Sequence, residues 1–336
     1  MTDDTHAYAR RNVLRGAAIG TALPFLPTTA HARTPSPATA TAARNRAEAS
    51  AHASASLRWL GTSGWRIDTG GRTVLFDPYL TRFRTGLFDG DFDPATRIAA
   101  TDPTLVREYA GRPELILVSH SHWDHIADVP YLAKTTGARV VGTETTFHLL
   151  VAFGVDPLQI SVVKGGEVLD FGGGLTVEVV ASLHSRNRKH SYFAPGTLTA
   201  PPAAAPATIS DLPEGDTLAF QVTAGSDGPA VFLMGASDFA ERAAEGLRPD
   251  VATVAVPSST ATHRYVPRLL RTLGFPPVVV PVHWDDFETP LRGPVVPDPT
   301  MDLSGLIGQV HRESPASRVV VPDYRTVYGG DMRPRR

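Results

Sequence analysis

The stretch HSHWDH, from His120 to His125, holds three histidines and one aspartate within six residues. The whole chain of 336 residues contains only 12 histidines, so a cluster of this density needs a chemical cause. On an extended loop His120 and His122 point the same way and can share one ion. Asp124 and His125 follow on the next turn and can face a second ion. Three protein ligands leave an open position for water, which is the arrangement of catalytic zinc sites.

Three later residues that can bind a metal also follow apolar, strand-like runs. His184 ends VEVVASLH, Asp238 follows AVFLMGAS, and His283 follows VVVPV. Strand ends that converge on one edge would bring these side chains to the histidine cluster. The chain has no cysteine, which excludes thiolate ligands and disulfides. Any metal must therefore be held by histidines and carboxylates.

The elements that would position these residues follow from the apolar pattern. The continuous apolar run ELILVS (114–119) predicts a buried strand, and the histidine cluster lies on the loop that leaves it. Strands come in runs, with helices after each half of the chain, which predicts two sheets packed together with helices outside in one domain of two similar halves. Further strands are predicted at 57–60, 65–68, 73–77, 138–142, 159–163, 167–171, 175–182, 217–222, 230–235, 250–256, 277–282 and 317–323, and helices at 102–110, 126–137, 143–154, 264–274 and 303–313.

The composition limits the classes of function. Apolar residues make up 42% of the chain and charged residues 20%, which is typical of a folded protein with a packed core. The formal net charge is −2, so the chain has no basic field that would attract nucleic acid. The expected partner at the site is a small-molecule substrate. Zero cysteine also suits an oxidising compartment.

The N-terminus predicts export. An arginine pair, Arg10 and Arg11, precedes an apolar stretch from Val13 to Leu26 and a small-x-small end at Ala32. This pattern is typical of a secretory leader over 1–32, cleaved near Ala32, with a secreted or extracytoplasmic mature protein. The spacing RRNVLR resembles the twin-arginine signal, whose export machinery is then a partner. A basic tail without structure is the alternative.

The segments after the arginines divide the chain. The apolar stretch is short and carries Pro24 and Pro27, so no stable membrane anchor is expected. Residues 33–56 are rich in Ala, Thr, Ser and Pro without a periodic apolar pattern, which predicts a flexible linker. The folded domain is expected over 57–336.

HSHWDH matches the HxHxDH signature of the metallo-β-lactamase superfamily of hydrolases. WLGTSGWRIDTGGRTVLFDPYLTR and HWDDF are similar to the branch with ascorbate-6-phosphate lactonase-like proteins and N-acyl-phosphatidylethanolamine phospholipase D. The resemblance covers residues 57 to about 325. It implies an αββα sandwich of two mixed β-sheets flanked by helices, with one or two metal ions, usually zinc; manganese and iron are the alternatives.

The resemblance also implies roles for individual residues. Asp238 would bridge two metals, and Asp77 would orient a ligand histidine or a bridging water. The bridging aspartate of the family usually follows a glycine directly, whereas this chain has GASD with Ala236 in that place. The implied metal ligands are His120, His122 and His184 for one ion and Asp124, His125 and His283 for the other.

These residues together predict an exported metal-dependent hydrolase. A bound metal lowers the pKa of water to about 7, so that hydroxide is available to attack a phosphodiester, lactone or ester. Asp124 would orient the nucleophile. The basic run SRNRKH suggests an anionic substrate; its alternative is a solvated loop. Arg186, Arg188 and His190 are the candidate substrate-binding residues, and His263 is a further candidate catalytic residue.

Two functions of other classes remain open on the sequence. One is a metal-binding member of the fold without turnover, and the other is an iron-dependent member that uses oxygen. The five histidines with Asp124 favour an enzyme.

Overall fold

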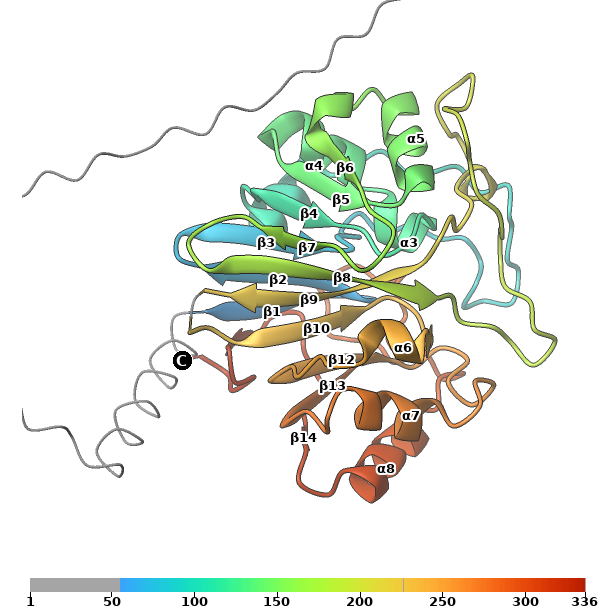
Figure 1. The fold of residues 1–336 in the computed structure, drawn as a ribbon. Helices are drawn as coiled ribbons and strands as arrows, with labels where there is room; N and C mark the ends of the chain where they lie inside the picture. The colour runs from blue at the N-terminus through green and yellow to red at the C-terminus, as the bar shows by residue number, and fades with distance from the viewer. Residues whose placement is uncertain (1–54, 226, 336) are drawn as a thin grey trace, which may run out of the picture. The chain divides into compact units, whose positions relative to one another are not determined.

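The computed structural model describes residues 55–225 and 227–335. The predicted leader and almost all of the predicted linker lie outside the described residues. Within the described part, two β-sheets are flanked by helices, as the sequence predicted. Figure 1 shows the helices of the first half, in green, at one side of the sheets and those of the second half, in orange and red, at the opposite side.

The first sheet contains the strands of the first half and one strand from the C-terminus. Its antiparallel part comes from the early hairpins, and its parallel part begins where β3 pairs with β4. The order is β15 (Val327–Gly329), β1 (Ser56–Gly61), β2 (Gly64–Thr69), β3 (Arg72–Phe76), β4 (Leu115–Leu117), β5 (Arg139–Gly142) and β6 (Ile160–Val162).

The second sheet is built from the second half in the same mixed way. The predicted hairpin is confirmed, because β9 and β10 pair antiparallel, while β10, β12, β13 and β14 are parallel neighbours. A further strand, β7 (Val168–Asp170), pairs with β8. The order is β11 (Asp238–Phe239), β8 (Leu175–Leu183), β9 (Leu218–Ala224), β10 (Ala230–Met234), β12 (Val251–Ala255), β13 (Val278–Val282) and β14 (Arg318–Val319).

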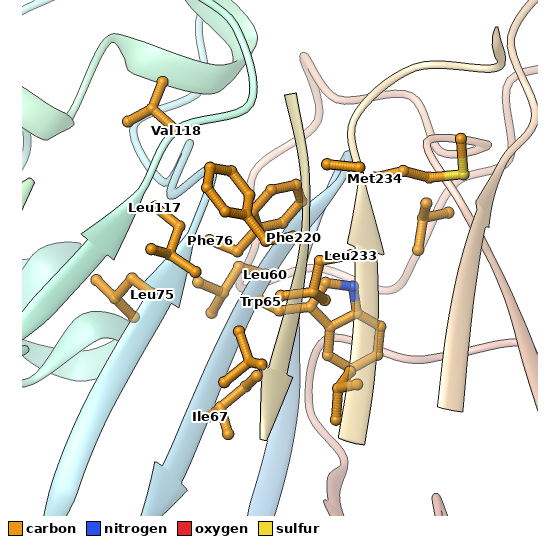
Figure 2. Packing of buried hydrophobic residues seen from close by; sticks show 14 of the residues in the cluster. Leu60, Trp65, Ile67, Leu75, Phe76, Leu117, Val118, Phe220, Leu233 and Met234 are labelled. Atoms are coloured by element: carbon orange, nitrogen blue, oxygen red, sulfur yellow. The ribbon is translucent and has the colours of Figure 1, made fainter. Parts of the chain in front are cut away.

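The core lies between the inner faces of the two sheets. Phe76 of β3 and Phe220 of β9 meet edge to face, with ring centroids 6.1 Å apart. Figure 2 shows Trp65, Ile67 and Leu233 in the same buried layer. Full burial of side chains of this size stabilises the fold by about 1.5–3 kcal/mol each. The packed layer therefore fixes the strand ends at which the candidate ligands lie.

The helices largely follow the predicted segments. α4 (Val129–Thr136) ends at Gly137, whose φ of 75° is the left-handed conformation expected at a helix end. The other long helices are α5 (Glu144–Ala152), α7 (Tyr265–Thr272) and α8 (Leu303–Glu313). α7 and α8 lie together at the side of the sheets where β14 is found (Figure 1).

Several short elements differ from the sequence prediction. The helix predicted over 102–110 is one turn, α2 (Pro103–Leu105), followed by a π-helix over Val106–Ala110. A separate short helix, α3 (Trp123–Ile126), begins inside the histidine cluster. β11, β15 and α6 (Glu241–Ala244) were not predicted, because two to four residues carry too little periodic pattern.

No helix in the described residues is long and apolar enough to cross a membrane.

Candidate metal centre

Three histidines from two segments form the first candidate metal site, called here the first triad. His120 lies on the loop after β4, His122 is the N-cap residue of α3, and His184 directly follows β8. Their ring centroids are 4.7–4.9 Å apart in all three pairs. One nitrogen of each ring lies within 4.8 Å of the other two. This spacing places three imidazole donors around one point.

The second triad is formed by Asp124 and His125 of α3 and by His283, which directly follows β13. Oδ2 of Asp124 lies 3.3 Å from Nε2 of His125 and 3.2 Å from Nε2 of His283. One ligand atom of each residue is again within 4.8 Å of the others. The two triads hold the same residues that the resemblance divided between two metals.

Asp77 contacts a histidine of the second triad. Its Oδ2 accepts a hydrogen bond from Ser119 Oγ at 2.6 Å and lies 2.8 Å from Nδ1 of His125. The same Ser119 hydroxyl lies 3.0 Å from Nδ1 of His120. One buried carboxylate therefore orients His125 directly and His120 through Ser119, and both rings keep Nε2 for a metal.

Local hydrogen bonds orient two further histidines. Nδ1 of His184 lies 2.8 Å from the carbonyl oxygen of Ser185, which leaves its Nε2 for a metal. The main-chain amide of His283 donates to the carbonyl oxygen of Thr62 at 2.8 Å. His283 adopts a φ of 59°, in the left-handed region that a non-glycine residue rarely occupies. The hydrogen bond to Thr62 stabilises this backbone conformation directly after the end of β13.

Burial sets the protonation states at the first triad. Burial lowers the pKa of His120 well below its usual value, the pKa of His122 to about 4 and that of His184 to about 3. All three imidazoles are therefore neutral at pH 7. Neutral imidazole is the form that binds a metal.

Charge pairing sets the protonation states at the second triad. Burial opposes ionisation of Asp124, yet His125 and His283 hold its pKa well below the usual range. Burial likewise disfavours a charged His125, but the carboxylates of Asp124 and Asp77 raise its pKa to about 10. The metal-free second triad therefore holds an ion pair. A metal cation bound there would replace the proton of His125 as the positive charge beside Asp124.

The donor set fits a divalent transition metal. The two triads offer five imidazoles and one carboxylate, which are nitrogen and oxygen ligands of the kind that zinc accepts. His120 is 1% exposed, and among the described residues its Nε2 has no hydrogen-bond partner. A buried donor atom without a partner is costly in a folded protein unless something binds it. Nε2 of His120, in the first triad, is such an atom, and a bound ion would give it a partner.

The structure does not bring Asp238 to either triad. In the described part of the chain its Oδ1 accepts a hydrogen bond from the amide of Phe239, and its main chain pairs with Leu183 in the short ladder between β11 and β8. The residue that directly follows β10 is Gly235. A Cβ at Gly235 would lie 2.3 Å from Oγ of Ser119, so any side chain there would displace the serine.

The expected substrate residues lie away from the space over the triads. Arg188, His190 and His263 are exposed, and none of them lines the cavity that the triads line. Arg186 lies over the ring of Tyr192, 5.7 Å from its centroid, and lines a neighbouring cavity. Tyr192 lines both cavities. Arg186 thus shares the wall of this neighbouring cavity with His184 of the first triad.

The cavity over the triads has a volume of about 290 Å³. Its polar wall includes the ligand histidines, Ser185, Asn187 and Tyr192. No pattern in the sequence indicated the apolar wall, although the tryptophan of HSHWDH and the phenylalanine of HWDDF belong to it. The apolar wall consists of Leu87, Phe92, Trp123, Phe193, Phe287 and Met301.

A buried network behind the second triad was also missed. Asp285, two residues after His283, accepts hydrogen bonds from the amide of Thr62 at 3.0 Å, from Nη2 of Arg82 at 3.0 Å and from the hydroxyl of Tyr324 at 2.5 Å. The side chains of Arg82 and Asp285 are almost completely buried. Only the repeated aspartate in HWDDF pointed to this position, because its partners come from remote segments.

Comparison with known proteins matches most of the described chain to one family. Residues 56–283 match a family model described as a β-lactamase superfamily domain. A metal-dependent hydrolase of Pyrobaculum arsenaticum is 29% identical over 132 residues, 39% of this chain and 52% of the relative. One from Cupriavidus taiwanensis is 34% identical over 137 residues, 39% of this chain and 42% of the relative. The chain spans about half the length of the curated relatives that it matches.

Solved structures show a similar fold at low sequence identity. A possible metal-dependent hydrolase of Veillonella parvula has a TM-score of 0.52 at 14% identity, covering 82% of this chain and 99% of its own. An isothiocyanate hydrolase from Delia radicum gut bacteria has a TM-score of 0.52 at 15% identity, covering 82% and 98%. A metallo hydrolase of Ignicoccus hospitalis has a TM-score of 0.50 at 19% identity, covering 80% and 94%. These likenesses concern the fold alone.

Proposed function

This chain belongs to the metallo-β-lactamase superfamily, and from that premise we propose that it is a metal-dependent hydrolase of an ester, a lactone or a phosphodiester. The observation that carries the proposal is the pair of triads, which face one cavity and consist of six buried or nearly buried ligand residues. In each triad one ligand atom of every residue lies within 4.8 Å of the ligand atoms of the other two.

We propose zinc as the metal, with up to two ions per chain. His120, His122 and His184 would hold one ion, and Asp124, His125 and His283 the other. A bound divalent metal lowers the pKa of water and polarises the scissile bond. Manganese and iron accept the same nitrogen and oxygen ligands, so elemental analysis of the purified protein separates the three metals.

The side chains of this protein supply the remaining parts of the reaction. Asp124 stays ionised at neutral pH, because His125 and His283 hold its pKa low against the effect of burial. An ionised carboxylate at the cavity wall orients the attacking water and can accept its proton. Asp77 and Ser119 keep His125 and His120 in fixed orientations. Fixed ligands cost no rearrangement when the substrate reacts.

An anionic group on the substrate would be held at the rim by Arg186. Its guanidinium lies over Tyr192, which also lines the cavity, and an arginine fork matches the oxygens of a carboxylate or phosphate. Arg188 and His190 are exposed on the same loop and lie farther along it.

The test combines metal analysis with a substrate panel. Purified protein is stripped with a chelator, reloaded with zinc, manganese or iron, and assayed on chromogenic esters, lactones and phosphodiesters. We expect one class to be hydrolysed, chelation to abolish the activity, and His120→Ala to reduce metal content and rate together. Metal binding without turnover of any class would make the chain a non-catalytic binder. If the protein consumes oxygen, and does so only with iron bound, the proposed hydrolase would be replaced by an iron-dependent enzyme that uses oxygen.

We also propose export through the twin-arginine route. The support is the arginine pair Arg10–Arg11 before an apolar stretch and the small residues at Ala32, all outside the described residues. Replacing both arginines with lysine keeps the charge and removes the signature. Precursor is then expected in the cytoplasm, and normal export of the double variant would overturn this route.

A further inference from the structure

One wall of the cavity over the triads is apolar and largely aromatic. Its six side chains come from separate parts of the chain: the loop before α2, the start of α3, the loop after β8, the loop after β13 and the segment before α8. Segments so far apart in sequence converge here only through the fold. We call this wall the aromatic cup, and it consists of Leu87, Phe92, Trp123, Phe193, Phe287 and Met301.

The rings of the cup contact one another. Phe193 meets Phe92 and Trp123 edge to face, with ring centroids 5.2 and 5.3 Å apart. Phe287 lies 6.4 Å from Trp123. These are the distances of favourable aromatic pairs, which hold the rings in defined orientations. The cup is therefore a preformed surface.

The cup adjoins both triads. The ring of Phe193 lies 5.8 Å from that of His122 in the first triad. The ring of Phe287 lies 5.2 Å from that of His283 in the second. A group seated in the cup would thus be attached directly to the bond that reacts at the triads.

The burial of these side chains is incomplete. Trp123 and Phe287 are almost fully buried, whereas Phe92 and Phe193 are half-buried and Leu87 is 41% exposed. The protein therefore leaves apolar surface in contact with water beside its candidate centre. A ligand that covers this surface gains free energy in proportion to the area removed from water.

In the described part of the chain, basic side chains line the neighbouring cavity and not the cavity with the cup. Among the described residues no lysine or arginine lines the cavity with the cup. Arg186, Lys164 and Glu214 line the neighbouring cavity, and Tyr192 lines both cavities, with its ring centroid 4.5 Å from that of His184. A charged group would gain no partner in the cup and would lose its hydration.

The cavity size fits one ring. It measures about 290 Å³ including the space over the triads. An apolar cavity of about 150 Å³ is large enough to bind benzene. The remaining volume leaves room for the scissile group itself.

We propose that the aromatic cup binds an uncharged, ring-sized apolar group next to the scissile carbonyl, so that the substrate is an ester or lactone of an aromatic or short branched acid. This rests on the proposed hydrolase function and narrows its substrate class. The oxygen of water bonds to the acyl carbon, the acyl–oxygen bond breaks, and the leaving oxygen takes the proton. An anionic tail, if the substrate has one, lies beyond Tyr192.

The first experiment compares 4-nitrophenyl phenylacetate with 4-nitrophenyl acetate, each rate divided by that for hydroxide alone. We expect kcat/KM to favour the phenylacetate by about 10-fold to 100-fold, the range for burying a phenylalanine-sized group. Phe193→Ala should reduce this preference to a few-fold. Phe83→Ala is the matched control, because Phe83 packs edge-on against Tyr79 and does not line the cavity. An equal preference for the phenylacetate in the wild type and both variants would overturn the proposal that the cup binds the ring.

The second experiment separates the cup from catalysis. Binding of phenylacetamide and acetamide is measured by saturation-transfer NMR, which requires no turnover. Phenylacetamide should bind to the wild type and the Phe83→Ala variant, and its signal should disappear in the Phe193→Ala variant. If the protein binds phenylacetamide but hydrolyses no ester, the proposed function would be refuted and the proposal that the cup binds a ring would stand. Absence of ring binding in the wild type would overturn the cup whatever the enzyme hydrolyses.

Discussion

Asp77 and His125 are joined by a contact of 2.8 Å between Oδ2 and Nδ1, and neither side chain is exposed to solvent. The same oxygen accepts a hydrogen bond from Ser119, whose hydroxyl contacts His120. Asp77 itself has a φ of 41°, a strained backbone for a residue with a side chain. The fold thus accepts local strain to place one carboxylate behind ligands of both triads.

Asp77→Asn tests this arrangement with a side chain of nearly the same shape. The carboxylate uses Oδ2 for the Ser119 hydroxyl and His125 and Oδ1 for the amide of Ser119, at 2.7 Å. The asparagine amide keeps one acceptor oxygen and turns the other into a donor, so it cannot serve both sides. We expect metal affinity to fall by about 10-fold to 100-fold, the usual effect of losing a group that orients a ligand. Isothermal titration with zinc checks this. Unchanged affinity would remove Asp77 from the metal centre.

Asp238→Ala tests the register at the end of β10. Because the side chain of Asp238 hydrogen-bonds locally to the amide of Phe239, we expect the metal content of the variant to equal that of the wild type. Asp124→Ala is the matched control, since Asp124 belongs to the second triad, and it should lose about one ion per chain. Elemental analysis after equilibrium dialysis measures both. A lower metal content in the Asp238→Ala variant would show that Asp238 binds after all.

The sequence predicted the parts of this protein that depend on local pattern. HSHWDH follows the predicted buried strand β4, although its second half forms α3, and His184 and His283 follow strands that the apolar runs had located. Ligand chemistry and strand ends are visible in neighbouring residues, so they can be predicted. The position of Asp238 depends on β11, a two-residue ladder that no periodicity reveals.

Long-range contacts explain what sequence reasoning missed. The partners of Asp285 come from residues far away in the chain, Arg82 and Tyr324, and only the folded structure joins them. Phe92 and Phe193 likewise meet across two long loops. Arg186 follows ligand His184 closely in sequence, yet it faces the cavity beyond Tyr192. Sequence adjacency to a ligand therefore does not place a side chain in the site.

Tyr324→Phe tests whether the buried network behind His283 positions the second triad. The change removes the hydroxyl that donates to Asp285 at 2.5 Å and contacts Arg82 at 3.0 Å. Leaving these buried charged groups with one partner fewer should lower the free energy of unfolding by about 1–3 kcal/mol. Chemical denaturation measures that loss. Zinc titration should show weakening at the second triad with the first retained, whereas equal weakening at both would indicate a general loss of structure.

Arg186→Ala tests the rim. Arg186 lies over Tyr192 and lines the neighbouring cavity, and among the described residues no lysine or arginine lines the cavity over the triads. We expect kcat/KM for an ester with a carboxylate tail to fall about 10-fold, the value of one lost charge-assisted hydrogen bond, and that for its neutral analogue to stay constant. Arg188→Ala is the control on the same loop. An equal effect on both substrates would indicate that the basic run SRNRKH is a solvated loop and does not bind the substrate.

Asp128→Asn tests a pH dependence of stability. Asp128 is buried, and its Oδ2 accepts hydrogen bonds from the amides of Leu80 and Thr81, both at 2.7 Å. Burial raises the pKa of Asp128 against these hydrogen bonds. The folded state therefore binds its proton more tightly than the unfolded state does. The contribution of this group to stability is fully present below the unfolded pKa and is lost as the pH rises through the folded pKa.

An asparagine keeps the acceptor oxygen for both amides and does not titrate. The Asp128→Asn variant should therefore gain stability relative to the wild type as the pH rises from about 4 toward 8, in urea denaturation at several pH values. Asp102→Asn is the control of opposite sign, because the amide of Thr104 lowers the pKa of Asp102, so this variant should gain relative stability as the pH falls. A stability difference for Asp128→Asn that does not change with pH would show that Asp128 titrates equally in both states.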